Sequence, residues 1–213
     1  MIRLACATGN PGKLREFRLA AQVQTVNPVA IELLPDFERI PPCVEDGATF
    51  EENAIRKARH YGPYAAGPLF ADDSGLEVDA LGGAPGVFSA RFAGPQATDA
   101  ANNRLLLEKL AGVTERQARF VCAIALIEGG AVRGVFRGAV EGIIALEARG
   151  TGGFGYDPLF YYPPFGCTFG EAPAEQKFAV SHRGQALRAL LASLEARGGF
   201  NNPPQAGSPA RLL

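Results

Sequence analysis

Residues 71–94 read ADDSGLEVDALGGAPGVFSARFAG, and an apolar run at 68–71 leads directly into the carboxylates Asp72 and Asp73. Such a run predicts a short buried strand, followed here by a turn at Ser74 and Gly75. Because neighbouring side chains of a strand point to opposite faces, one carboxylate can enter a site while the other supports the backbone or a nearby cation. Mg2+ would relieve the repulsion between them. A solvated turn is the alternative.

The composition is that of an ordinary globular protein. The chain has 213 residues, of which 47% are hydrophobic and 20% charged, and its formal net charge is -1. This length predicts one domain with a smaller lobe. Balanced charge provides no field to hold a nucleic acid polymer, so an anionic ligand must meet a local cluster. Neither a bilayer-spanning apolar run nor a signal peptide is present, which predicts a cytoplasmic protein that binds no membrane.

The chain has four cysteines, at Cys6, Cys43, Cys122 and Cys167. They show no C-x-x-C spacing and have only two histidines as companions, which argues against a zinc site or a cysteine nucleophile. We therefore expect free thiols, buried at Cys6 and Cys122, which lie in apolar runs. Residues 198–213 contain Gly-Gly, Asn-Asn and Pro-Pro pairs and predict a flexible tail after a single domain at 1–197.

The first strand, predicted at 2–7, leads into a glycine-containing turn and a helix. This segment consists of Thr8, Gly9, Asn10, Pro11, Gly12 and Lys13. Asn10 suits the N-cap and Pro11 the first helical position. Free amides at the helix start, the helix dipole and Lys13 together would form an anion site, although the P-loop pattern is absent. A well-capped structural helix is the alternative.

A second helix is predicted at 49–59, where Thr49 and Glu52 have the spacing of a capping box. This spacing explains Glu52 structurally, so Glu52 is not expected to be a ligand. Asn53 and Lys57 are four residues apart and share one helix face, from which Lys57 could meet an anion. A solvated helix face is the alternative.

The second half of the chain predicts mainly strands. A half-buried strand is expected at 76–81, and a helix that starts at Thr98 or Asp99 follows. Three further strands are expected in the segments 119–128, 132–136 and 140–146. The first two would form a hairpin across Gly129 and Gly130. Together these elements predict a mixed sheet with antiparallel pairing in its second half.

Residues 150–158 read GTGGFGYDP, in which four glycines surround two aromatic residues. A flat ligand can approach such a backbone closely, with Phe154 stacked on a base and Asp157 accepting a hydrogen bond from it. A floppy surface loop is the alternative. The final helix is predicted to begin at Ser181, which places His182 and Arg183 in its first turn. A cation is unfavourable there unless an anion or a carbonyl is bound.

Six segments follow one another along the chain, namely Thr8-Gly9-Asn10 with Lys13, 50–54 with Lys57, 71–76, 82–86, 152–158 and 181–184. As an ordered set they resemble the Ham1/inosine triphosphatase family of non-canonical purine nucleoside triphosphate pyrophosphatases. The resemblance implies a homodimeric α/β enzyme with an elongated mixed β-sheet flanked by helices and an active-site cleft between two lobes. Such an enzyme would use Mg2+ to hydrolyse ITP, dITP and XTP to the monophosphate and pyrophosphate.

The resemblance also implies roles for individual residues. Asp73 would be the general base and a metal ligand, with Glu45 as the second ligand. The triphosphate would be bound by Thr8, Gly9, Asn10, Pro11, Gly12 and Lys13. The remaining substrate contacts would be Lys57, Ser74, Phe154, Gly155, Tyr156, Asp157, Lys177, His182 and Arg183.

Two rival functions are consistent with parts of this pattern. A Maf-like pyrophosphatase has a related architecture but acts on other nucleotides. A non-catalytic nucleotide-binding module would need the phosphate and base contacts but not the acidic pair Asp72 and Asp73, whose presence therefore favours an enzyme.

Overall fold

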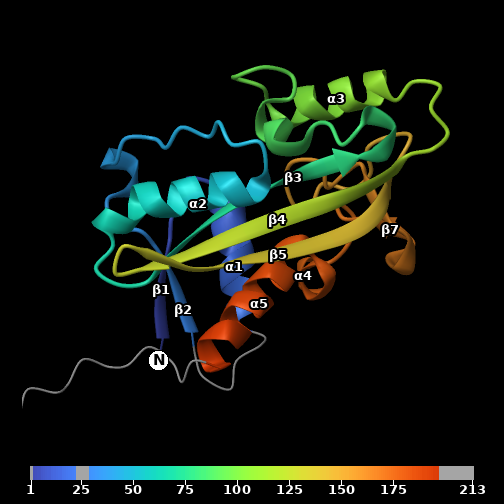
Figure 1. Ribbon diagram of the computed structural model, residues 1–213. Helices are drawn as coiled ribbons and strands as arrows, with labels where there is room; N and C mark the ends of the chain where they lie inside the picture. The colour runs from blue at the N-terminus through green and yellow to red at the C-terminus, as the bar shows by residue number, and fades with distance from the viewer. Residues whose placement is uncertain (1, 23–28, 197–213) are drawn as a thin grey trace, which may run out of the picture.

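The computed structural model describes residues 2–22 and 29–196, which contain one seven-stranded mixed sheet (Figure 1). The strands are β1 (Ile2–Cys6), β2 (Val29–Leu33), β3 (Leu69–Val78), β4 (Gln117–Glu128), β5 (Ala131–Ile144), β6 (Phe160–Tyr162) and β7 (Cys167–Thr168). Their order across the sheet is β2-β1-β3-β4-β5-β6-β7. β1 pairs in parallel with β2 and β3, whereas every later pair is antiparallel. The predicted mixed α/β sheet is confirmed.

Helices cover both faces of this sheet. The α-helices are α1 (Pro11–Gln22), α2 (Phe50–Tyr61), α3 (Asp99–Lys109), α4 (Ala174–Val180) and α5 (His182–Ala196). The 3-10 helices are η1 (Phe37–Arg39), η2 (Gly62–Tyr64), η3 (Asp79–Leu81), η4 (Gly86–Arg91) and η5 (Pro163–Phe165). α2 lies on one face of the sheet, and α1, α4 and α5 lie on the other (Figure 1). No helix within the described residues is long and apolar enough to cross a membrane.

Local capping explains where the helices begin. The Lys13 amide donates to Asn10 Oδ1 at 3.1 Å, and the Glu52 amide donates to Thr49 Oγ1 at 3.1 Å. Ser181 caps α5 in the same way, through the amide of the third residue that follows it. These side chains satisfy amides that have no partner within their own helix. All three predicted helix starts are confirmed.

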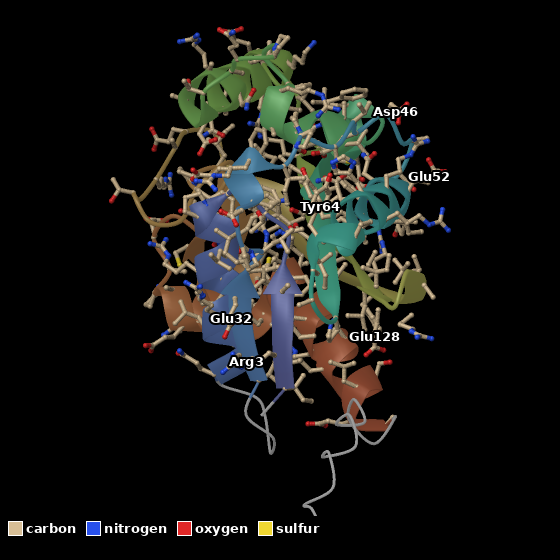
Figure 2. All side chains as sticks on the ribbon, turned by 90° about the vertical axis from the view of Figure 1, so that its left-hand side faces the viewer. Arg3, Glu32, Asp46, Glu52, Tyr64 and Glu128 are labelled. Atoms are coloured by element: carbon tan, nitrogen blue, oxygen red, sulfur yellow. The ribbon has the colours of Figure 1, made fainter. Side chains whose placement is uncertain are left out.

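Glu52 has the structural role that its spacing predicts. Its carboxylate accepts a hydrogen bond from the Ala48 amide at 2.8 Å. The side chain is exposed and lies at the same outer edge of the molecule as Asp46 (Figure 2). It therefore points away from the cluster of carboxylates described below.

The predicted turn at Ser74 and Gly75 is wrong, because β3 continues without interruption from Leu69 to Val78. Its ladder with β4 includes Ser74 opposite Cys122 and Gly75 opposite Val121. The strand predicted at 76–81 is the end of β3, and its last three residues form η3 instead.

The two strands predicted at 132–136 and 140–146 are one strand, β5, and this separation was also wrong. Gly138, which lies between the two predicted strands, is within the ladder. A Cβ atom there would lie 2.7 Å from the Ala186 amide nitrogen of α5, so this glycine allows the helix to pack closely on the sheet. The hairpin across Gly129 and Gly130 is confirmed.

The four cysteines are free, and Cys6 and Cys122 are buried, as predicted. The tail predicted at 198–213 lies outside the described residues.

Candidate active site

The candidate site lies where β1 and β3 separate. β1 ends at Cys6 and pairs with β3 only through Leu69 and Phe70, so the β1-facing edge of β3 has no strand partner from Ala71 until Glu77 bridges to Pro85. A pocket of about 400 Å³ occupies this position. It is lined by the turn after β1, by residues of α2, β3, η4 and α3, and by a glycine-rich loop. The predicted site residues that line it are Thr8, Gly9, Asn10, Lys13, Glu45, Lys57, Asp73, Ser74, Phe154, Gly155, Tyr156, Asp157 and Arg183.

The two central carboxylates belong to opposite faces of β3. Asp72 Oδ2 accepts from Lys13 Nζ of α1 at 2.8 Å, and Asp73 Oδ1 accepts from Lys57 Nζ of α2 at 3.0 Å. The alternation of a strand thus directs each acid toward a lysine from a different helix layer. Although burial raises the pKa of Asp72, the nearby cations Lys13, Arg183 and Lys57 lower it more. Asp72 is therefore a buried, ionised partner for Lys13.

Asp73 has the environment of a base. Burial raises the pKa of its carboxyl, and the lowering effect of Lys57 and Lys13 only partly offsets this. Its second oxygen, Oδ2, accepts from Asn53 Nδ2 at 3.0 Å, and Asn53 Oδ1 in turn accepts from the Gly47 amide at 2.8 Å. Asn53 therefore fixes the orientation of this carboxylate from α2, with both of its own polar groups in use.

Glu45 and Asp73 form a suitable pair of ligands for Mg2+. One oxygen of each lies within 3.0 Å of the same point, the Nζ atom of Lys57, so the two carboxylates converge on one cation. Within residues 2–22 and 29–196 no group of three or more His, Cys, Asp or Glu side chains could hold a metal. Mg2+ commonly binds one or two carboxylates together with substrate phosphates and waters. These residues fit that arrangement.

A buried ionic network lies behind the pocket and centres on Glu16, which the sequence analysis did not identify. Its two oxygens accept from Lys177 Nζ at 2.9 Å and from Arg183 Nη1 at 2.8 Å. Lys177 Nζ also donates to Asp157 at 2.5 Å, and Arg183 Nη2 donates to Ser74 Oγ at 2.9 Å. α1, β3, α4, α5 and the glycine-rich loop are thereby joined through one carboxylate.

The glycine-rich loop is held by hydrogen bonds from both sides. The Phe154 amide donates to Asp157 Oδ2 at 2.8 Å, within the loop. From α3, Asp99 Oδ2 accepts from the Gly155 amide at 2.7 Å, and Asn103 Nδ2 donates to the Gly155 carbonyl at 3.0 Å. These contacts fix the loop in place, in contrast to the floppy surface loop that was the alternative prediction. Neither α3 residue was identified as part of the site from the sequence.

Four predicted site residues do not line this pocket, namely Pro11, Gly12, Lys177 and His182. Gly12 provides space for the loop, because a Cβ atom there would lie 2.8 Å from Phe154 Cδ1. Pro11 begins α1. Lys177 is buried in the Glu16 network, and its Nζ lies 5.5 Å from the centroid of the Phe154 ring.

His182 is buried with its ring stacked on Phe120, at a centroid distance of 4.9 Å and an interplanar angle of 12°. Neither ring nitrogen has a hydrogen-bond partner. Burial and the nearby cations Arg183, Lys177 and Lys13 hold its pKa well below the ordinary value. The imidazole is therefore neutral, and the unfavourable cation expected at this helix start is absent at His182.

Comparison with known proteins identifies the family of this chain. The sequence model of the Ham1 family matches residues 4–193, a range that includes every residue of the site. The chain belongs to the Ham1 family. Two similar Ham1 relatives bear the name dITP/XTP pyrophosphatase. The one from an Exiguobacterium species is 50% identical over 193 residues, covering 91% of this chain and 97% of that protein. The one from Geobacter sulfurreducens is 50% identical over 200 residues, covering 93% and 99%.

Solved structures of Ham1 proteins share the fold. The structure of a HAM1 protein from Coxiella burnetii superposes with a TM-score of 0.80 and 42% sequence identity, covering 92% of this chain and 100% of that chain. The structure of the Staphylococcus aureus Ham1 protein gives a TM-score of 0.80 and 39% identity over 92% and 99%. The fold of the Ham1 family therefore applies to the whole described sheet.

Proposed function

We propose that this protein is a dITP/XTP pyrophosphatase that hydrolyses dITP, XTP and ITP to the monophosphate and pyrophosphate with Mg2+. The observation that carries this proposal is the pairing of Asp72 with Lys13 and of Asp73 with Lys57 in one pocket. A protein of net charge -1 can hold a triphosphate, with about four negative charges, only through such a local set of cations. The names of the Ham1 relatives support the same activity.

Each part of the pocket has a task in this reaction. The turn at Thr8, Gly9 and Asn10 would place the phosphates at the positive end of the α1 dipole, with Lys13 beside them. Asp73 would accept the proton of the water that attacks between the first and second phosphates. Mg2+, held by Asp73 and Glu45, would neutralise phosphate charge in the transition state.

The pocket also offers a means of selecting the base. Phe154 lines the pocket and presents an aromatic face for stacking. Hypoxanthine and xanthine carry a 6-oxo acceptor beside an N1-H donor, whereas adenine has the reverse pattern. A donor such as Arg183 would reject ATP, because polar groups of the complex would remain unpaired.

Pyrophosphate release from dITP, XTP, ITP, ATP and GTP, each with Mg2+ and with a chelator, tests the proposal. We expect turnover that depends on the metal and is confined to the first three nucleotides. Turnover of ATP and GTP as well would still support a pyrophosphatase reaction but would refute the proposed selectivity for the base. Tight binding without turnover would instead identify a nucleotide-binding module.

A further inference from the structure

We propose that Lys57 keeps divalent metal out of the free enzyme, so that Asp73 and Glu45 accept Mg2+ only together with a nucleotide. The inference rests on the proposed function, since it concerns the metal of that reaction. It adds an order to the binding events, in which the metal and the triphosphate each depend on the other.

The ammonium group of Lys57 already occupies the place that a metal would take. Its Nζ lies 2.7 Å from Glu45 Oε2, 3.0 Å from Asp73 Oδ1 and 3.0 Å from the Asp72 carbonyl oxygen. An ammonium has three hydrogens, so these three acceptors use all of them. The Lys57 side chain is 11% exposed, which leaves little access for water.

A metal at this point must displace the ammonium. Mg2+ requires oxygen ligands at about 2.1 Å, closer than any donor in a hydrogen bond. A divalent ion and an ammonium that share the same oxygens would repel each other strongly in a buried site. Both Asp73 oxygens already accept a hydrogen bond, Oδ1 from Lys57 and Oδ2 from Asn53, so a metal at either oxygen would crowd an existing donor. If Lys57 simply turned away, its charge would be buried without a partner, which is costly.

A triphosphate resolves this conflict, because it offers Lys57 new anionic partners in the same pocket. Lys57 lines that pocket together with Thr8, Gly9 and Asn10 at the start of α1. The phosphates would also complete the metal shell, for which the described residues provide only two converging carboxylates. Metal and nucleotide therefore favour each other's binding, and the coupling is equal in both directions.

Lys13 provides a matched comparison. It is a second lysine of the same pocket, but it pairs with Asp72 Oδ2 at 2.8 Å and has no ion pair with Glu45 or Asp73. Lys13→Met and Lys57→Met remove the same charge from the same pocket. Only the second variant frees the two proposed metal ligands.

The test is a titration with Mn2+ alone, in which electron paramagnetic resonance measures the unbound ion in the presence of the full-length protein. Without nucleotide, we expect Lys57→Met to bind Mn2+ roughly 10- to 100-fold more tightly than the wild type, the usual range of such couplings. Lys13→Met should change the affinity much less. Once the Mn2+ that the nucleotide chelates by itself is accounted for, a methylene-bridged, non-hydrolysable dITP analogue should tighten Mn2+ binding to the wild type by a similar factor and to Lys57→Met by less.

Equal Mn2+ affinity of the wild type and a folded Lys57→Met would overturn the proposal. It would also be overturned if, without nucleotide, Lys57→Met and Lys13→Met bound Mn2+ more tightly than the wild type by the same factor. Circular dichroism checks that each variant folds. If Lys57→Met does not fold, the wild type alone decides, because Mn2+ binding that the analogue leaves unchanged excludes the coupling. The Mn2+ titrations measure binding at equilibrium, whereas the substrate panel measures turnover. Either proposal can therefore be refuted while the other is supported.

Discussion

Glu16→Gln is expected to lower the free energy of unfolding by about 3–5 kcal/mol, the usual cost of removing one partner from a buried ion pair. Glu16 is 2% exposed, and each of its oxygens accepts from a different cation, Lys177 or Arg183. Glutamine keeps the shape of the side chain but removes the charge. It also places an amide group, which can only donate, against one of two cationic donors.

The size of the effect follows from the partners that Lys177 and Arg183 keep when Glu16 loses its charge. Lys177 keeps Asp157 at 2.5 Å, so its charge remains compensated. Arg183 is 7% exposed and keeps only the neutral Ser74 hydroxyl as a side-chain hydrogen-bond partner. Arg183 is therefore the charge that is left unpaired. For a chain of this length, the loss corresponds to a decrease of roughly 6–20 °C in Tm.

The effect should depend on pH with a definite sign. Burial raises the pKa of Glu16, but Arg183 and Lys177 lower it more, and the result is a lowered pKa. A carboxyl with a lowered pKa in the folded state contributes stability above its unfolded pKa and loses it as the pH falls through the folded pKa. The difference between wild type and variant should be complete at pH 7 and shrink below about pH 4.

Urea denaturation between pH 3 and 7 measures both quantities. Glu108→Gln is the control, because Glu108 and its partner Arg104 are exposed and lie 3.9 Å apart. That substitution should cost no more than about 0.5 kcal/mol. If Glu16→Gln costs no more than the control, or if its cost stays constant down to pH 3, the argument from buried charge is refuted.

Substitutions at three further positions test other parts of the structure. Asp73→Asn should lower the rate of pyrophosphate release by ~10²-fold or more with unchanged circular dichroism, and near wild-type turnover would exclude Asp73 as the base. Asp99→Leu should raise the KM for dITP, because the Gly155 amide loses its acceptor, whereas Asp99→Asn keeps one; equal KM values for the two variants would contradict this positioning role. Gly75→Ala should lower the free energy of unfolding by about 1–3 kcal/mol in urea, since its Cβ would lie 2.6 Å from the Gly86 carbonyl oxygen, and an unchanged midpoint would show that η4 moves aside easily.

Short-range rules predicted the parts of this fold whose partners are close in sequence. The caps at Asn10, Thr49 and Ser181 each bond an amide three residues away, so a local pattern contains both partners. Thirteen of the 17 predicted site residues line one pocket, and their roles in binding and catalysis stay predictions. The expected homodimer and the cytoplasmic location stay predictions.

Glycine misled the sequence analysis, because a glycine can serve close packing as well as a turn. Gly75 lies inside β3, where its missing side chain makes room for η4. Gly138 lies between the strands predicted at 132–136 and 140–146 but is inside β5, where a Cβ atom would come within 2.7 Å of the Ala186 amide nitrogen. The neighbours that require these glycines are 11 or more residues away, so a window of local sequence does not contain the reason.

Glu16 was missed for a similar reason, although the sequence does contain a signal. Together with Phe17, Ala20 and Ala21 it forms the buried face of α1, so it is an acidic residue on an otherwise apolar stripe. Such a position requires a buried cationic partner. The partners, Lys177 and Arg183, lie more than 160 residues further along the chain, and only the tertiary structure identifies them.

The open edge of β3 connects the fold to the chemistry. β1 stops pairing after Cys6, so β3 extends past its parallel neighbour with carboxylates on both of its faces. Lys57 donates to the Asp72 carbonyl at this edge and to the Asp73 carboxylate, so one side chain satisfies both the free backbone and the charge. A strand that continued to pair with β1 would have no place for Lys57. The early end of β1 thus creates the pocket and leaves acidic and carbonyl oxygens in it that require a cation. Lys57 is that cation in the free protein, and in the proposed complex the metal would take its place while the triphosphate pairs with Lys57.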